Sequence, residues 1–157
     1  MSDDLNPIRT IMESVRTCML TTVSEDGSLH STPMTTQQAQ FDGDAWFLVG
    51  RTSHTAQHIE ATPTVNVSYS GDTSWLSLAG SARVVTDDAK KAELWNTFAE
   101  AWFPDGEHDP DVVVLQVEAG SAQYWESPGK VKMLASMLKA RVTGNTPDGG
   151  DSDKVEL

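Results

Sequence analysis

The chain has 157 residues and a mass of 17.0 kDa, which fits one domain large enough to bury a hydrophobic core. Its formal net charge of −12 disfavours binding to nucleic acid and to anionic membranes, because phosphate contacts need clustered Lys and Arg. Cys18 is the single cysteine, so no intrachain disulfide can form. With an acidic N-terminus and no long apolar run, we expect a cytoplasmic protein with neither signal peptide nor membrane span.

The first elements are a short helix and a hairpin. Pro7 follows a capping asparagine, and apolar residues at helical spacing then predict a helix over about 7–17. Two strands, 19–24 and 28–35, flank the turn Glu25-Asp26-Gly27, in which glycine permits a positive φ.

The next segment is apolar on both faces. Ala45–Val49 therefore reads as a strand buried on both sides, and Asp42-Gly43 is expected to join it to Gln38–Phe41. A short helix over Ser53–Ala61 should follow, ended by Pro63 because the residue before proline avoids the helical region.

The second half predicts a third antiparallel pair and a longer helix. The pair is 65–70 with 74–85, and Gly80 inside the long strand indicates a bend or bulge. Acids at 87–88 open a helix that Pro104 should end. Its apolar stripe is formed by the aliphatic stem of Lys91 and by Trp95, Phe98 and Trp102.

The chain is expected to end with two strands, a helix and a tail. Strands 112–117 and 122–125 should turn around Ala119-Gly120-Ser121. A helix over about 131–141 carries an apolar side that should pack on the barrel or on a partner chain. Residues 143–157 form an acidic tail that is mobile or docked on a partner, so residues 1–142 make the single domain. Many short strands with helices between them predict an antiparallel barrel with peripheral helices.

Two stretches contain residues that a purely structural role does not explain. Pro33 cannot donate to a sheet ladder, so its strand should lie at an edge or a bulge. The segment Gly50–Thr55 runs into a helix N-terminus rich in hydroxyls, which offers unpaired N–H groups to an anion. Arg51 is the only Lys or Arg between Arg16 and Arg83. Together the two stretches could hold a flat polar ring at one end and a phosphate at the other.

Other reactive-looking residues have simpler interpretations. His54 and His58 are four residues apart on a predicted helix, but the glutamate of a zinc-protease motif is absent, and we assign no metal site. No Gly-x-Ser-x-Gly motif or phosphate-binding loop supports a hydrolase or a nucleotide triphosphatase. Cys18 has no basic neighbour to lower its pKa and reads as a small buried residue.

An ordered set of short motifs resembles one known family. The motifs are Met19-Leu20-Thr21-Thr22-Val23 with Asp26-Gly27, His30-Ser31-Thr32-Pro33-Met34, Asp42-Gly43 before Trp46-Phe47, Ser53-His54, Trp75-Leu76-Ser77-Leu78-Ala79-Gly80-Ser81-Ala82, Leu94-Trp95, Trp102-Phe103-Pro104-Asp105-Gly106, Asp109-Pro110 and Tyr124-Trp125-Glu126-Ser127-Pro128. From about Leu5 to the C-terminus, the chain resembles the general stress protein 26 group of the pyridoxamine phosphate oxidase-like flavin-binding split barrels.

The resemblance implies a mainly β (α+β) fold, a six-stranded antiparallel split barrel that forms a homodimer with one FMN in each of two clefts. It implies that the strand His30, Ser31, Thr32, Pro33 and Met34 faces the flavin ring. It implies that the segment Val49, Gly50, Arg51, Ser53, His54 and Thr55 holds the phosphate. Trp75 or Trp125 would reach the ring from the other subunit. Relatives commonly carry lysine where this chain has Thr55, which leaves Arg51 and the helix N-terminus to hold the phosphate.

The first functional hypothesis is an FMN-dependent oxidoreductase that passes a hydride or electrons from NAD(P)H to a small acceptor, with the flavin supplying the chemistry. No residue of the sequence stands out as an obligatory acid or base. The alternative is a non-catalytic dimeric flavin-binding or ligand-free module of the stress response. A third hypothesis keeps the split barrel but replaces FMN by a deazaflavin or a haem-related ligand.

Overall fold

The computed structural model describes residues 6–36, 41, 43–128, 130–144, 146 and 151–157, without the side chains of residues 130, 131 and 151. Within these ranges, no helix has both the length and the hydropathy needed to cross a bilayer. The expected strand Gln38–Phe41 and its turn at Asp42 lie largely outside the described residues.

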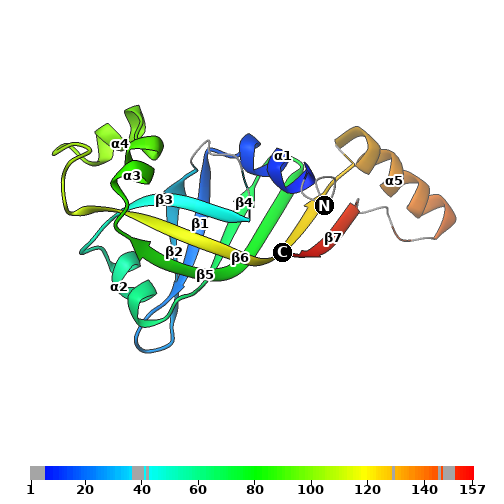
Figure 1. The fold of residues 1–157 in the computed structure, drawn as a ribbon. Coiled ribbons are helices and arrows are strands. Elements are labelled where there is room, and N and C mark those ends of the chain that lie inside the picture. Colours follow the sequence, from blue (N-terminus) through cyan, green and yellow to red (C-terminus); the bar gives the residue numbers. More distant parts are fainter. Residues whose placement is uncertain (1–5, 37–40, 42, 129, 145, 147–150) are drawn as a thin grey trace.

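One antiparallel sheet curls into an open barrel (Figure 1). Its strand order is β2-β1-β4-β5-β6-β3, and β7 pairs with β6 as an additional strand. The two strands at the ends of this order, β2 and β3, leave the barrel split between them. The antiparallel split barrel is therefore confirmed, with a seventh strand beyond the expected six. The strands are β1 (Thr17–Val23), β2 (Leu29–Thr35), β3 (Asp44–Gly50), β4 (Thr64–Ser70), β5 (Ser74–Val85), β6 (Val112–Glu126) and β7 (Asp151–Glu156).

The barrel bends at the glycine that the sequence singled out. The register between β5 and β6 shifts between Ala79 and Gly80, which confirms the expected bulge. A Cβ at Gly80 would lie 2.0 Å from the carbonyl oxygen of Glu118, so only glycine permits this close approach. The expectation of a turn at Ala119-Gly120-Ser121 was wrong: β6 runs unbroken through it, because the bulge absorbs the irregularity within the ladder.

The helices are α1 (Asn6–Ser14), α2 (His54–Ala61), α3 (Asp88–Leu94), α4 (Thr97–Trp102) and α5 (Lys130–Thr143). Helix α1 ends before Thr17, because that residue already begins β1. The single helix expected from 87 to Pro104 was wrong, because the chain breaks at Trp95 and restarts as α4. The side chain of Asn96 caps α4 by accepting a hydrogen bond from the Ala99 N–H at 2.9 Å.

Two hydrophobic clusters lie on opposite sides of β3. Ala45, Phe47 and Val49 face the barrel interior, where side chains of the other strands and of α1 and α2 pack. Leu48 faces the second cluster with residues of β6, α3 and α4. The expectation that this strand is buried on both sides is thus confirmed.

The C-terminal helix forms as predicted, and part of the tail after it pairs with the barrel of the same chain. Helix α5 projects away from the barrel (Figure 1), and its side chains Leu134, Met137, Leu138 and Val142 are exposed rather than packed on the barrel. Residues Asp151–Glu156 of the expected tail form β7 against Ser121–Glu126 of the same chain. The tail thereby protects one edge of β6 from pairing with another chain.

Candidate functional site

A pocket of about 330 Å³ opens at the split of the barrel. It lies between the two end strands, β2 and β3, and is bordered by the start of α2 and by α4. Its size falls at the lower end of the range for small-molecule sites. The lining residues are Thr17, Thr32, Pro33, Met34, Thr35, Leu48, Val49, Gly50, Ser53, Thr55, Phe98, Ala99, Trp102 and Phe103.

The pocket brings the two polar stretches of the sequence together. Thr32, Pro33 and Met34 contribute one wall, and the segment from Val49 to Thr55 contributes the facing one. Among the described strands, β2 and β3 each pair on one edge with their sheet neighbour and do not pair with each other. The pocket therefore lies between two strand edges that are not hydrogen-bonded to each other, and its lining is mostly apolar.

Ser53 shapes the start of α2. Its hydroxyl donates to the Gly50 carbonyl at 2.7 Å and accepts from the Ala56 N–H at 3.2 Å. The serine is therefore the N-cap of the helix, and its own oxygen is already engaged. Thr55, two residues further on, is buried and lines the pocket.

Two aromatic side chains of α4 were missed as site residues. Phe98 and Trp102 line the pocket, yet they are 54% and 73% exposed in this chain. Sequence reasoning assigned both to the packed stripe of one long helix. The signal that could have separated them is Asn96, a preferred capping residue in the middle of that stripe.

Arg51 lies beside the pocket and does not line it. Its backbone N–H donates to the Asp111 carbonyl at 2.6 Å, and its side-chain Nε donates to the Pro110 carbonyl at 3.2 Å. These bonds attach the exposed arginine to the loop that precedes β6. The guanidinium retains donors that Nε does not use.

His30 and His54 do not line the pocket, and each lies near His58. Both flank His58, with ring centroids 5.2 Å and 6.3 Å from its ring. His58 Nδ1 shares a hydrogen bond of 3.0 Å with the Thr22 hydroxyl, which ties α2 to β1. Among the described residues, no group of three or more His, Cys, Asp or Glu side chains is placed to hold a metal ion.

The remaining predicted residues lie on the outer face of the sheet. Ser31 on β2 shares a hydrogen bond of 2.7 Å with Thr21. Trp75 and Trp125 are directly opposite each other on β5 and β6, and both are exposed. None of the three lines the pocket of its own chain.

Cys18 lies beneath the pocket wall. Its thiol is buried and donates to the Met34 carbonyl at 3.6 Å. Burial raises the pKa of Cys18 to about 12, and a hydrogen bond with Tyr69 only partly offsets that effect. The thiol is therefore protonated at neutral pH, in line with the interpretation of Cys18 as a structural residue.

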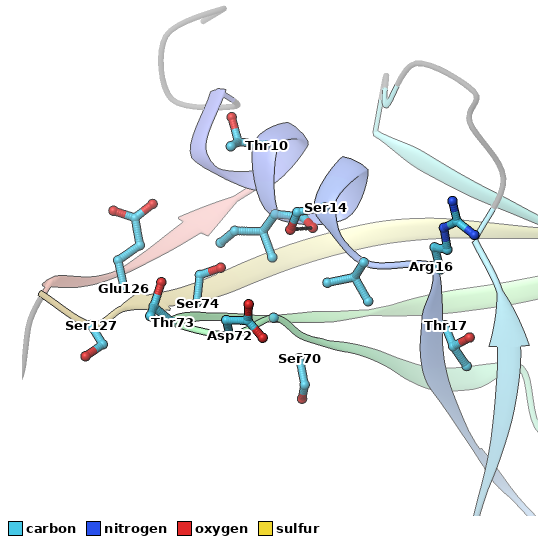
Figure 2. Close-up of a pocket in the computed structure, with 13 residues that line it drawn as sticks. Thr10, Ser14, Arg16, Thr17, Ser70, Asp72, Thr73, Ser74, Glu126 and Ser127 are labelled. Carbon is cyan, nitrogen blue, oxygen red and sulfur yellow. Dashed lines mark hydrogen bonds between the residues drawn. The ribbon is translucent and has the colours of Figure 1, made fainter. Parts of the chain in front are cut away.

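A second pocket, of about 640 Å³, lies where α1 approaches the β4–β5 turn (Figure 2). Its lining is rich in hydroxyl groups and includes the carboxylates of Asp72 and Glu126. In Figure 2 the Arg16 side chain stands at the start of β1 and points away from both carboxylates. This pocket contains none of the candidate binding residues that the sequence indicated.

Residues 3–148 match the family model described as pyridoxamine 5'-phosphate oxidase like. The chain belongs to the pyridoxamine 5'-phosphate oxidase-like family. The match spans every residue that lines the pocket at the split.

Individual relatives place the chain near the general stress proteins of this family. A protein of Jannaschia sp. CCS1 named general stress protein 26 is 29% identical, with all of both chains covered and a TM-score of 0.79. A general stress FMN/FAD binding protein of Xanthomonas citri is 27% identical, with 83% of this chain and 93% of that chain covered and a TM-score of 0.70. Protein bli-3 of Neurospora crassa is 27% identical over 92% of this chain and 75% of its own length.

Proposed function

We propose that this member of the pyridoxamine 5'-phosphate oxidase-like family binds FMN in the pocket at the split of its barrel. The observation that carries the proposal is the pocket itself, which unites Thr32–Met34 with Val49–Thr55 between the two end strands. The FMN/FAD binding described for the Xanthomonas citri relative gives independent support.

The lining fits a flavin chemically. Apolar side chains such as Met34, Leu48 and Phe98 can contact the faces of a planar ring, and β2 offers backbone groups at its edge for the polar rim. Phosphate would lie at the N-terminus of α2, where backbone N–H groups carry partial positive charge. Arg51 is the nearby guanidinium, and Thr55 supplies a hydroxyl in place of a cation.

The flavin, when bound, supplies hydride or electron transfer, for which we propose NAD(P)H as donor and a small molecule as acceptor. The chain's own part is to orient the ring against β2 and to exclude water with the aromatic side chains of α4. The proposed active form is a homodimer, in which Trp75 or Trp125 of a second copy would cover the open side of the pocket.

Paired titrations with FMN and riboflavin test the phosphate assignment. Riboflavin lacks the phosphate, so Arg51→Gln should weaken FMN about tenfold, the equivalent of one charge-assisted contact, and leave riboflavin unchanged. Thr55→Lys should strengthen FMN alone. Arg83→Gln makes the same charge change as Arg51→Gln at a guanidinium that is bonded to Gln116, and should alter neither affinity. Equal losses for both ligands in Arg51→Gln would refute the assignment.

Turnover needs its own measurement. Anaerobic addition of NADPH or NADH to the FMN-loaded protein should bleach the flavin absorbance if the protein is an oxidoreductase. A loaded protein that keeps its colour would instead be a non-catalytic flavin-binding module. A protein that binds no flavin, either as purified or after FMN addition, would refute the proposed cofactor and direct the search to a deazaflavin, a haem-related ligand or none.

A further inference from the structure

A second groove continues from the proposed flavin pocket toward α1. It has a volume of about 770 Å³ and shares three lining residues, Thr17, Thr35 and Phe98, with the pocket. The two cavities therefore adjoin at these three residues. The other lining residues of the groove are Arg9, Met12, Glu13, Val15, Arg16, Thr36, Phe41, Asn96 and Thr97.

The groove is locally cationic in an acidic protein. Arg9 and Arg16 carry two positive charges there against the single carboxylate of Glu13, whereas the whole chain has a formal net charge of −12. Within the described residues, no salt bridge joins Glu13 to either arginine. A small anion therefore meets attraction in this groove, while large polyanions are repelled by the rest of the surface.

Hydrogen bonds hold the side chain of Arg9 and the backbone of Arg16 in place. Nε of Arg9 donates to the Phe41 carbonyl at 3.0 Å, which fixes the guanidinium on α1. Arg16 lies at the junction of α1 and β1, and its carbonyl accepts from both the N–H and the hydroxyl of Thr36, at 2.8 Å and 3.0 Å. These bonds hold the backbone of Arg16 while its exposed side chain turns away from Asp72 and Glu126 (Figure 2).

The other walls of the groove are suited to the aromatic ring of a ligand. Phe41 and Val15 are buried behind the groove, Met12 is half-buried, and Phe98 stands where the groove meets the pocket. Four threonines, Asn96 and Glu13 complete the lining beside the two arginines. An apolar floor beside guanidinium groups, which match carboxylates in a bidentate geometry, suits an aromatic ring that carries one carboxylate.

We propose that this groove is the substrate subsite, and that it takes a small aromatic monocarboxylate whose carboxyl group binds Arg16 and Arg9 and whose ring contacts Phe98 beside the flavin. This proposal rests on the proposed flavin site for its role in turnover. Binding of the carboxylate itself requires only this chain. The flavin phosphate is assigned to the start of α2, whose Ser53 and Thr55 line the flavin pocket and not the groove, whereas Arg9 and Arg16 line the groove and not the flavin pocket.

Titration with sodium benzoate tests the subsite on the flavin-free protein, by calorimetry or by chemical shifts. Benzoate should bind, and the uncharged benzamide should bind at least about tenfold more weakly, the equivalent of one charge-assisted contact. Arg16→Gln should weaken benzoate by a similar factor and leave benzamide unchanged. Arg141→Gln is the matched control, since it makes the same charge change on α5, away from the barrel. Equal affinity for benzoate and benzamide, or equal effects of Arg16→Gln and Arg141→Gln, would overturn the proposal.

A second measurement tests the contact between the two ligands. Benzoate, but not benzamide at the same concentration, should shift the visible spectrum of the FMN-loaded protein. Binding of benzoate without any spectral change would overturn the placement beside the flavin. A loss of FMN affinity but not riboflavin affinity in Arg16→Gln would assign the arginine to the flavin phosphate instead. If FMN does not bind at all, the proposed function is refuted. The benzoate titration of the flavin-free protein still tests whether the groove binds an aromatic carboxylate.

Discussion

At the scale of single residues, Asp26 organises the turn between β1 and β2. Its Oδ1 accepts hydrogen bonds from the Ser24 hydroxyl, from the Ser28 hydroxyl and from the Ser28 N–H at 2.9 Å. These bonds, the one from Ser24 first, hold the pKa of Asp26 far below its usual range. The turn thereby supports the register that pairs Thr32–Met34 of β2 with Cys18–Leu20 of β1.

The depressed pKa predicts a pH-dependent contribution to stability. Because the folded-state pKa lies below the unfolded value of about 3.9, ionised Asp26 stabilises the fold above that pH, and the stabilisation is lost as the pH falls further. Asp26→Asn should therefore lower the melting temperature at pH 7, and the difference from the natural protein should shrink below about pH 4. Thermal melts of Glu25→Gln provide the control, because Glu25 accepts none of these three bonds. A difference that stays constant between pH 7 and pH 3 would contradict this account.

The buried thiol gives a second prediction at this scale. With its pKa raised to about 12 by burial, Cys18 has almost no thiolate at neutral pH. A thiol reagent such as 5,5'-dithiobis(2-nitrobenzoate) should react with the folded protein only through unfolding, and promptly in denaturant. Rapid reaction of the folded protein at pH 8 would show that the thiol is accessible.

At the scale of elements, the bulge between β5 and β6 depends on Gly80. Gly80→Ala would drive a Cβ into the Glu118 carbonyl, and overpacking of this kind costs about 2 kcal/mol or more of unfolding free energy. Gly120→Ala is the matched control in the same bulge, because its nearest neighbour would be the Ala79 carbonyl oxygen at 3.7 Å; it should change stability by about 0.5 kcal/mol or less. Urea denaturation of the two variants measures both values, and similar losses would contradict the close-approach argument.

Sequence patterns located most elements because their signals are local. Ser53 and Pro63 mark the two ends of α2. Alternating side-chain polarity and the turn residues between them mark the first two strands. The apolar stripe does not predict the split of the helix before Pro104, because Asn96, which lies between two residues of that stripe, competes for the backbone as a cap. The unbroken β6 was missed because a glycine and two small residues are equally compatible with a turn and with a bulge.

The candidate site was predictable only in part, for a similar reason. Thr32–Met34 and Val49–Thr55 were found because proline and a capping serine leave local marks. Phe98 and Trp102 reach the pocket through tertiary packing of α4, which no sequence spacing records. The groove between α1 and α4 combines residues that are about 80 positions apart, so it appears only in the folded chain.

At the scale of the whole molecule, one chain leaves several apolar surfaces uncovered. Met19, Trp75 and Trp125 are 37–40% exposed on the outer face of the sheet, and α5 exposes a further row of apolar side chains. Such exposed apolar side chains are available for burial against another chain. The pocket itself is open beside α4, where Trp102 is largely exposed. These features agree with the proposed homodimer, in which each copy completes the cleft of the other.

The proposed homodimer predicts linked changes in mass and in flavin affinity. The natural protein should sediment at twice the 17.0 kDa of the chain. Met19→Glu places a charge on the outer face of the sheet, which the proposed interface would bury, at a residue that does not itself line the pocket. It should therefore yield monomers, because an unpaired buried charge is costly. If the second copy closes the cleft, FMN affinity should fall together with dimer content and recover at high protein concentration. Leu138→Glu, on the exposed apolar side of α5, shows which of the two apolar surfaces forms the interface. If Leu138→Glu is monomeric and Met19→Glu stays dimeric, the interface lies on α5 and the sheet-face arrangement is refuted.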